Sequence, residues 1–176
     1  VQVAARRVEA ALARPIVWDG QQLYTSASIG VCLSETGAPP EQYLRNADIA
    51  MYGAKRSGRG VEVFDASMHE ATAERLSLET DLRRAVERRE FAIHYQPIVR
   101  VEDAKLEGFE ALLRWDHPRR GRVSPAEFIP LLEETRLIVQ VGAWVVAEAC
   151  RQLRDWQRAH SGAASCFVSV NLSSVQ

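Results

Sequence analysis

The stretch GFEALLRWDHP, residues 108–118, has the alternation of a β-strand. One face of such a strand is apolar and carries Phe109, Ala111, Leu113 and Trp115. The opposite face carries Glu110, Leu112 and Arg114. A carboxylate and a guanidinium on one face of an apolar strand either pair with each other or are presented to a ligand.

The overall composition is that of a soluble globular protein. The chain has 176 residues, of which 47% are hydrophobic and 26% charged, which predicts one domain or one and a part of another. The net charge of -1 gives no electrostatic case for nucleic acid or an anionic membrane, although a few local cations could still hold a phosphate. No apolar run is long enough for a membrane segment.

The cysteines favour buried thiols in a reducing compartment. Cys32, Cys150 and Cys166 are odd in number and have no CxxC spacing, which argues against a disulfide scaffold or a zinc site.

The first 66 residues show alternating helical and strand patterns, as in an α/β unit. The expected elements are a helix over 1–14, a hairpin that turns at WDGQQ (18–22), a strand over 23–31, a Gly- and Pro-rich loop at 35–40, a helix over 40–58 and a strand over 60–65. The stretch 66–90 has no Gly or Pro and carries an apolar stripe of Leu78, Leu82, Ala85 and Val86. We therefore expect a helix that links two units.

The remaining residues predict the opening of a second α/β unit with a mainly parallel sheet. The expected elements are strands over 91–99 and 105–115, a helix over 124–135, a long amphipathic helix over 137–160 and a strand over 165–174. Ser124 is the expected N-cap of the first helix and Pro125 its first residue. Pro97, which follows Gln96, is expected to stop strand pairing.

Polar side chains on these strands point to metal and phosphate chemistry. Glu110 and Asn171 offer the oxygen ligands that Mg²⁺ prefers, and Arg114 suits a phosphate because its planar fork can bind two oxygens. Together they indicate a metal-assisted reaction on a phosphate ester. Two simpler explanations stay open, namely an ion pair between Glu110 and Arg114 and a turn-forming role for Asn171.

A second candidate is the stretch AKRSGRG, where Lys55 and Arg59 lie four residues apart beside two glycines. Cations at the end of a helix are favoured by the helix dipole alone, and spacing alone favours that explanation over phosphate binding.

Several segments resemble known families. YTSASIGVCLS (24–34), LRNADIAMYGAKRSGRG (44–60) and VEVFDASM (61–68) resemble the C-terminal part of a GGDEF domain, the diguanylate cyclase fold. LRRAVERREFAIHYQPIV (82–99), GFEALLRWDHP, VSPAEFIPLLEET (123–135) and VSVNLS (168–173) are similar to the N-terminal part of an EAL domain. The resemblance implies α/β architecture, with a partial GGDEF sandwich (1–66), a linker helix (67–90) and a partial (β/α) barrel of EAL type (91–176).

The resemblance also implies a function, namely metal-dependent opening of cyclic di-GMP to the linear dinucleotide by the longer parent protein. It implies that Glu110 is catalytic and that Glu110 and Asn171 bind Mg²⁺ or Mn²⁺. It further implies that Gln96, Leu112, Arg114 and Pro125 contact the dinucleotide, and that Lys55 and Arg59 lie near the phosphates of GTP. The alternative is a non-catalytic module that binds a nucleotide or a protein.

From the resemblance we expect the chain to be an excerpt of a longer bacterial signalling protein in the cytoplasm. Whether that protein forms a homodimer, or has a membrane anchor outside these residues, stays open. Expressed alone, the 176 residues are expected to be inactive, to bind little magnesium and to aggregate, because a partial barrel leaves sheet edges open. One departure concerns Arg136, which stands where the family usually has Gly. A left-handed residue there would cost on the order of 1 kcal/mol.

Overall fold

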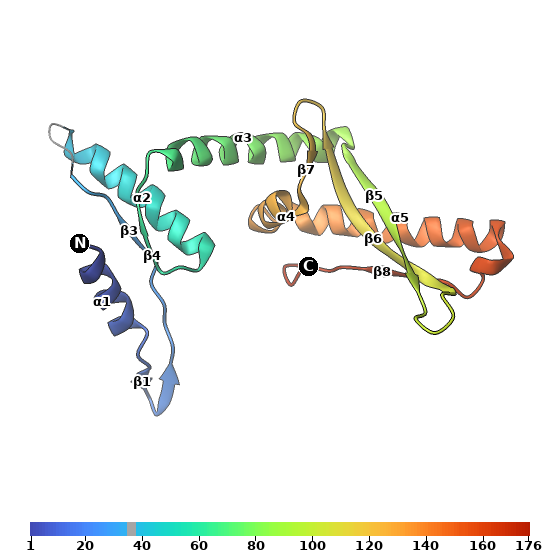
Figure 1. The fold of residues 1–176 in the computed structure, drawn as a ribbon, viewed down its shortest axis with the longest axis horizontal. Coiled ribbons are helices and arrows are strands. Elements are labelled where there is room, and N and C mark those ends of the chain that lie inside the picture. Colours follow the sequence, from blue (N-terminus) through green and yellow to red (C-terminus); the bar gives the residue numbers. More distant parts are fainter. Residues whose placement is uncertain (35–37) are drawn as a thin grey trace. The chain divides into compact units, whose positions relative to one another are not determined.

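Helices and strands alternate along the chain in Figure 1, as the sequence predicts for an α/β protein. The computed structural model describes residues 1–34 and 38–176, so the first half of the expected loop at 35–40 lies outside the described residues. The chain divides into two units, Val1–Leu76 and Ser77–Gln176. Within the described residues, every helix is too short or too polar to cross a membrane.

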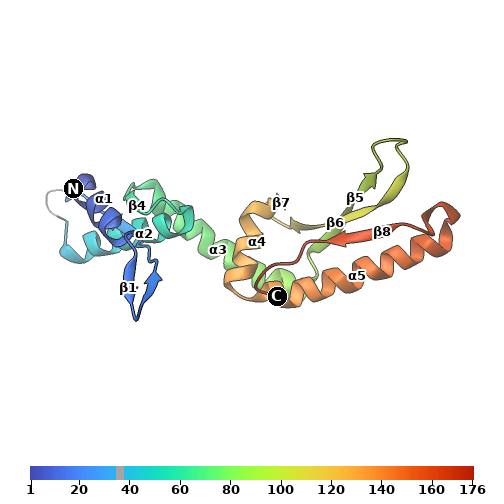
Figure 2. The ribbon, with the colours of Figure 1, turned by 90° about the horizontal axis from the view of Figure 1, so that it is seen from below.

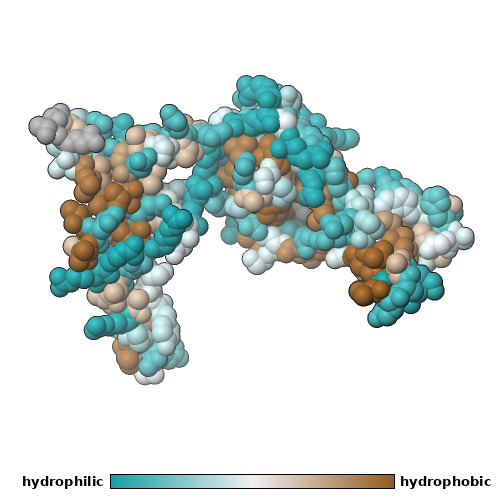
Figure 3. Space-filling model, viewed as in Figure 1, coloured by the Kyte–Doolittle hydropathy of each residue, from teal (hydrophilic) through white to brown (hydrophobic). Residues whose placement is uncertain are grey.

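The N-terminal unit begins with α1 (Gln2–Leu12) and the hairpin of β1 (Ile16–Trp18) and β2 (Gln21–Leu23). Asp19 and Gly20 have φ angles of 49° and 76°, the positive pair that a tight two-residue hairpin turn requires. The expected hairpin at WDGQQ is therefore confirmed. The apolar side chains of α1 are largely exposed, with Val3 at 74%, and apolar surface is visible on this unit in Figure 3.

The single strand expected over 23–31 is wrong, because the chain leaves strand geometry after β2 and resumes it only at β3 (Ile29–Val31). The two pieces serve different partners, since β2 pairs with β1 while β3 runs parallel to β4 (Val61–Val63). A parallel pair needs a crossover, and α2 (Pro40–Ser57) supplies it.

Close packing of α2 on β3 depends on Gly30. A Cβ atom there would lie 1.9 Å from the carbonyl oxygen of Ala47, so any larger residue would push the helix away from the sheet. Ala50 and Ala54 are fully buried on the same helix. Gly58 ends α2 with φ of 67°, which confirms the expected stop.

Helix α3 (Ser67–Arg88) follows β4. Hydrogen bonds from the side chain and backbone of Ser67 hold the pKa of Asp65 below its usual value, as expected for a carboxylate at a helix start. The predicted stripe is confirmed, since Leu78, Leu82 and Ala85 are buried in the core of the C-terminal unit.

The sheet of the C-terminal unit is centred on β6 (Leu106–His117). One edge of β6 pairs antiparallel with β5 (Phe91–Val99). The other edge is shared between β8 (Phe167–Val170), which runs parallel to it, and the short β7 (Gly121–Val123), which runs antiparallel. The expectation of a mainly parallel sheet is met only by the β6–β8 pair among the described strands, and β7 was not expected.

Pairing of β5 and β6 continues past Pro97, which stands opposite Phe109. The prediction that this proline stops the ladder is therefore wrong. In the described sheet β5 pairs only with β6, and an edge strand tolerates proline because its outward N–H groups need no partner.

Helices α4 (Pro125–Glu134) and α5 (Leu137–Ala159) belong to the same unit as this sheet, and Figure 2 shows α5 running beneath β6 and β8. The core between the layers contains Trp115, Phe128, Leu82, Leu131 and Leu132, all essentially inaccessible to solvent. Trp115 confirms the apolar face predicted for residues 108–118. Its indole Nε1 donates to Glu90 Oε2 at 3.2 Å.

A buried polar junction joins α3 to the turn after β6. His117 Nδ1 accepts the backbone N–H groups of Arg119 and Arg120 at 3.1 and 3.0 Å. The ring proton therefore belongs on Nε2, which lies 3.2 Å from Asp81 Oδ2. Both side chains are buried. The spacing of histidines in the sequence gave no sign of this contact, because its partners lie 36 positions apart.

Arg136 has φ of 59° and ψ of 9° between α4 and α5, which confirms the left-handed conformation expected at this position. An L-residue with a Cβ atom is strained in this region. The structure keeps the conformation because α5 starts in a new direction directly after it.

Asp81→Ala should lower the free energy of unfolding of the C-terminal unit by about 1–3 kcal/mol, because it removes the buried carboxylate that lies 3.2 Å from His117 Nε2. Asp81→Asn should lose less, since it retains an acceptor oxygen. Denaturation followed by tryptophan fluorescence measures both, and Glu79→Ala is the control because its exposed pair with Arg83 is worth less than about 1 kcal/mol. Equal effects of Asp81→Ala and Glu79→Ala would contradict the junction.

Arg136→Gly should raise the free energy of unfolding by about 1 kcal/mol, because it removes the left-handed strain. The matched control is Arg136→Ala, which removes the side chain but keeps the strain. Urea midpoints of the three proteins measure the difference. The strain explanation fails if the Gly and Ala variants have the same stability.

Candidate functional site

The strand register brings polar side chains from three strands into one row. Gln96 on β5 stands opposite Glu110 on β6, and Glu110 stands opposite Ser169 on β8. Alternation then puts Leu112 and Arg114 on the Glu110 side of β6. The row is therefore on the face that does not pack into the helical core.

Glu110 and Asn171 meet directly. Asn171 follows the last residue of β8, and its Nδ2 donates to Glu110 Oε1 at 2.7 Å. The two residues are 61 positions apart in the chain. This contact orients the amide so that its Oδ1 is left for another ligand, and it argues against the explanation of Asn171 as a simple turn-former.

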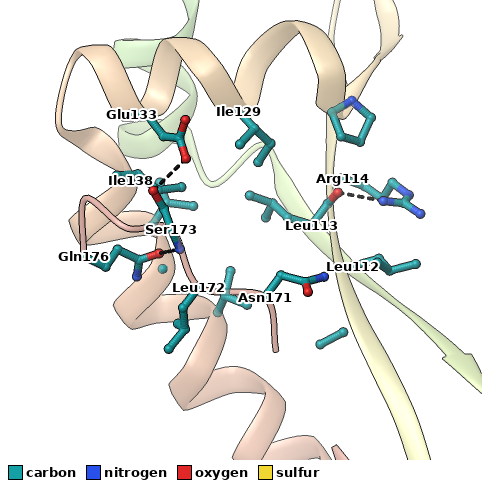
Figure 4. Close-up of a pocket in the computed structure, with 15 residues that line it drawn as sticks. Leu112, Leu113, Arg114, Ile129, Glu133, Ile138, Asn171, Leu172, Ser173 and Gln176 are labelled. Atoms are coloured by element: carbon teal, nitrogen blue, oxygen red, sulfur yellow. Dashed lines mark hydrogen bonds between the residues drawn. The ribbon is translucent and has the colours of Figure 1, made fainter. Parts of the chain in front are cut away.

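Glu110 and Arg114 do not form the ion pair that the sequence left open, because each has a different partner. Arg114 Nη1 donates to the carbonyl oxygen of Leu113 at 2.9 Å. In the described part of the chain, the side-chain partner of Glu110 is Asn171. In Figure 4 the side chains of Leu112 and Arg114 extend from the opposite side of β6 to that of Leu113. The remaining guanidinium donors are therefore available to an anion.

A pocket of about 250 Å³ lies beside this row (Figure 4). Four of the predicted site residues contribute to its lining: Leu112, Arg114, Pro125 and Asn171. Glu110 contacts the lining residue Asn171, and Gln96 stands opposite Glu110 in the ladder. Much of the other lining is apolar and comes from α4 and α5, for example Ile129 and Ile138.

The donor chemistry of Glu110 and Asn171 fits a hard divalent cation. A carboxylate and an amide oxygen are suitable ligands, but Mg²⁺ takes about six oxygens and these two residues supply only part of such a shell. Across residues 1–34 and 38–176, no group of three or more His, Cys, Asp or Glu side chains could hold a metal ion. The pair therefore offers oxygens for only part of such a shell.

Lys55 and Arg59 lie in the N-terminal unit. Lys55 is in the last turn of α2, and the Arg59 guanidinium, 73% exposed, lies 3.7 Å from Glu62 Oε1. Both residues belong to a different unit from the Glu110 row. Their contact with GTP phosphates stays a prediction.

The pocket also contains a polar pair that the sequence did not indicate. Glu133 on α4 and Ser173 after β8 both line the pocket, and Ser173 Oγ donates to Glu133 Oε1 at 2.6 Å. The only sequence signal is the pattern Ser-x-x-Gln at 173–176, which is typical of a helix start. Nothing in that pattern indicates Glu133 as a partner.

Comparison with protein families gives two matches. Residues 79–176 match the EAL domain, and residues 1–61 match the diguanylate cyclase GGDEF domain. These matches cover most of the chain, whereas the finer division into 1–66, 67–90 and 91–176 stays a prediction.

Curated relatives share the same organisation. The chain is 43% identical over 174 residues to the bifunctional diguanylate cyclase/cyclic di-GMP phosphodiesterase MucR of Pseudomonas aeruginosa, covering 98% of this chain and 25% of the relative. It is 40% identical over 157 residues to the cyclic di-GMP phosphodiesterase PdeR of Escherichia coli, covering 88% and 23%. The chain thus spans about a quarter of the length of these relatives.

Solved structures agree with this relationship. The phosphodiesterase PaMucR in complex with c-di-GMP superimposes with a TM-score of 0.52 at 50% identity, covering 55% of this chain and 38% of that one. The EAL enzyme Bd1971, bound to cAMP and cyclic di-GMP, gives a TM-score of 0.53 at 26% identity, covering 78% and 36%. The chain therefore belongs to the EAL domain family and carries GGDEF sequence ahead of it, in the tandem order of cyclic di-GMP signalling proteins.

Proposed function

We propose that this chain contributes the first part of the active site of a cyclic di-GMP phosphodiesterase. In this proposal Glu110 and Asn171 hold a divalent cation, Mg²⁺ or Mn²⁺, and the product is the linear dinucleotide. The support comes from the family match, from relatives named as cyclic di-GMP phosphodiesterases, and from the 2.7 Å contact of Glu110 with Asn171. That contact is the observation that carries the proposal.

Each predicted residue has a task that follows from its place. Glu110 and Asn171 present oxygens to the cation, and their mutual hydrogen bond fixes both side chains before it binds. Arg114 uses one Nη1 hydrogen on the Leu113 carbonyl and retains donors for a phosphate oxygen of the dinucleotide. A bound divalent cation supplies Lewis-acid activation of water and of the phosphate ester.

The remaining contacts are with the rest of the dinucleotide. Gln96 stands beside Glu110 in the ladder, where its amide can donate to or accept from the ligand. Leu112 and Pro125, which border the pocket, offer apolar surface for a purine base. In the N-terminal unit, we propose separately that Lys55 and Arg59 contact the phosphates of GTP.

The competing function is a regulatory module that binds cyclic di-GMP or a protein without turnover. Both functions use Gln96, Leu112 and Arg114, so ligand binding alone does not separate them. Turnover does, because only a phosphodiesterase needs the cation at Glu110. The test must therefore measure product formation as well as binding.

Glu110→Ala in the full-length protein should lower the rate of cyclic di-GMP hydrolysis more than 100-fold, because it removes a proposed metal ligand. Loss of a residue that only supports a metal ligand lowers activity about 10- to 100-fold. Chromatographic measurement of the linear dinucleotide at saturating Mg²⁺ checks this. Glu107→Ala is the matched control, since Glu107 lies on the same strand and pairs with Arg100 at 2.8 Å.

The two functions give different results in this assay. A wild-type protein that binds cyclic di-GMP but forms no linear product at any Mg²⁺ or Mn²⁺ concentration is the regulatory module. Retained metal-dependent turnover in Glu110→Ala would show that Glu110 is not the ligand.

A further inference from the structure

The hydroxyl group of Ser173 connects two segments that are far apart in the chain. Its oxygen accepts the backbone N–H of Val175 at 3.2 Å. Its own proton is therefore free to go to Glu133 Oε1, which lies 2.6 Å away on α4 (Figure 4).

The segment around Ser173 is itself closed by reciprocal hydrogen bonds. Gln176 Oε1 accepts the backbone N–H of Ser173 at 3.1 Å, and the backbone N–H of Gln176 donates to the Ser173 carbonyl at 3.0 Å. Together with the Val175 contact, these bonds resemble a capping box, except that Ser173 Oγ accepts from Val175 and not from Gln176. Residues 173–176 therefore form one rigid turn, and Glu133 ties that turn to α4.

Asn171 lies between this tied turn and the sheet. On its N-terminal side, the β8 ladder ends at Val170, which pairs with Ala111 of β6. On its C-terminal side, the Glu133–Ser173 contact begins two residues later. The backbone of Asn171 is thus held from both directions, while its side chain is exposed and reaches Glu110.

We propose that Glu133 and Ser173, the Glu133–Ser173 clamp, are positioning residues that hold Asn171 where its side-chain oxygen and Glu110 can bind the same divalent cation. The inference rests on the proposed function of Glu110 and Asn171 as metal ligands. Without the clamp, the chain after Val170 has lost its tie to α4 and Asn171 samples more conformations. The cation then binds more weakly although both of its ligands are still present.

The test is direct binding of Mn²⁺ to the full-length protein, with free Mn²⁺ measured by electron paramagnetic resonance. Glu133→Ala and Ser173→Ala should each raise the Mn²⁺ dissociation constant about tenfold, within the range for outer partners of a metal ligand. The double variant should be no weaker than either single variant, because both residues act through one contact. Glu133→Gln should recover part of the affinity, since its amide oxygen still accepts from Ser173.

The matched control is Glu127→Ala, which removes a carboxylate from the same helix at an exposed position and should leave the Mn²⁺ affinity unchanged. Thermal midpoints are recorded for every variant. If Glu133→Ala does not fold, Ser173→Ala and Glu133→Gln carry the test. A positioning role moves the Mn²⁺ dissociation constant in variants whose folded state is intact, which a role in stability alone does not.

The results distinguish failure of the Glu133–Ser173 clamp from failure of the proposed metal site at Glu110 and Asn171. If Glu110→Ala loses Mn²⁺ binding while both clamp variants bind like the wild type, the clamp is wrong and the metal site stands. If the wild type binds Mn²⁺ no better than Glu110→Ala, the proposed metal site is wrong and the inference falls with it. An additive double variant would also overturn the clamp as a single unit.

Discussion

The register of β6 between β5 and β8 is the constraint on which the rest of the C-terminal unit depends. It sets Gln96, Glu110 and Ser169 side by side and turns Trp115 into the core. A slip of one residue would exchange the two faces, exposing Trp115 and burying Glu110 among apolar side chains. Core packing and the polar row are therefore two results of the same register.

Three features of the unit keep that register in place. Trp115 packs against Phe91 and Phe128, with ring centroids 5.9 and 5.8 Å away, so the strand cannot slide without opening the core. His117 ties the end of β6 to α3 through Asp81. At the other end of the site, the Glu133–Ser173 contact ties the segment after β8 to α4. The polar row is thus supported by contacts well away from it.

The geometry also explains why an apolar strand carries two charged residues on one face. The Glu110 carboxylate is paired with an amide and not with Arg114. An amide carries no net charge, so it does not offset the charge of a carboxylate toward a cation, as a guanidinium would. Keeping Arg114 separate leaves it free to meet an anion beside that cation. Under the proposed function, this separation lets Glu110 meet the cation while Arg114 meets the phosphate.

The local features of this protein were determined by its sequence alone. The alternation in 108–118, the turn at Asp19-Gly20 and the stop at Gly58 follow from the chemistry of a few neighbouring residues, and all are present in the structure. The left-handed Arg136 was expected only from the family's usual glycine at that position, and it too is present. The family of the chain could also be identified from its motifs. The local pattern wrongly predicted that strand pairing stops at Pro97 and that 23–31 is one strand. Both features depend on which strand lies alongside.

Only the tertiary structure decided which distant side chains meet. Asp81 and His117 are 36 positions apart, Glu133 and Ser173 are 40 apart, and Glu110 and Asn171 are 61 apart. No periodicity relates such pairs, since each depends on strand order and on the direction in which a helix leaves the sheet. The sequence could therefore name Glu110 and Asn171 as candidates, but their hydrogen bond, and the clamp behind it, required the folded chain.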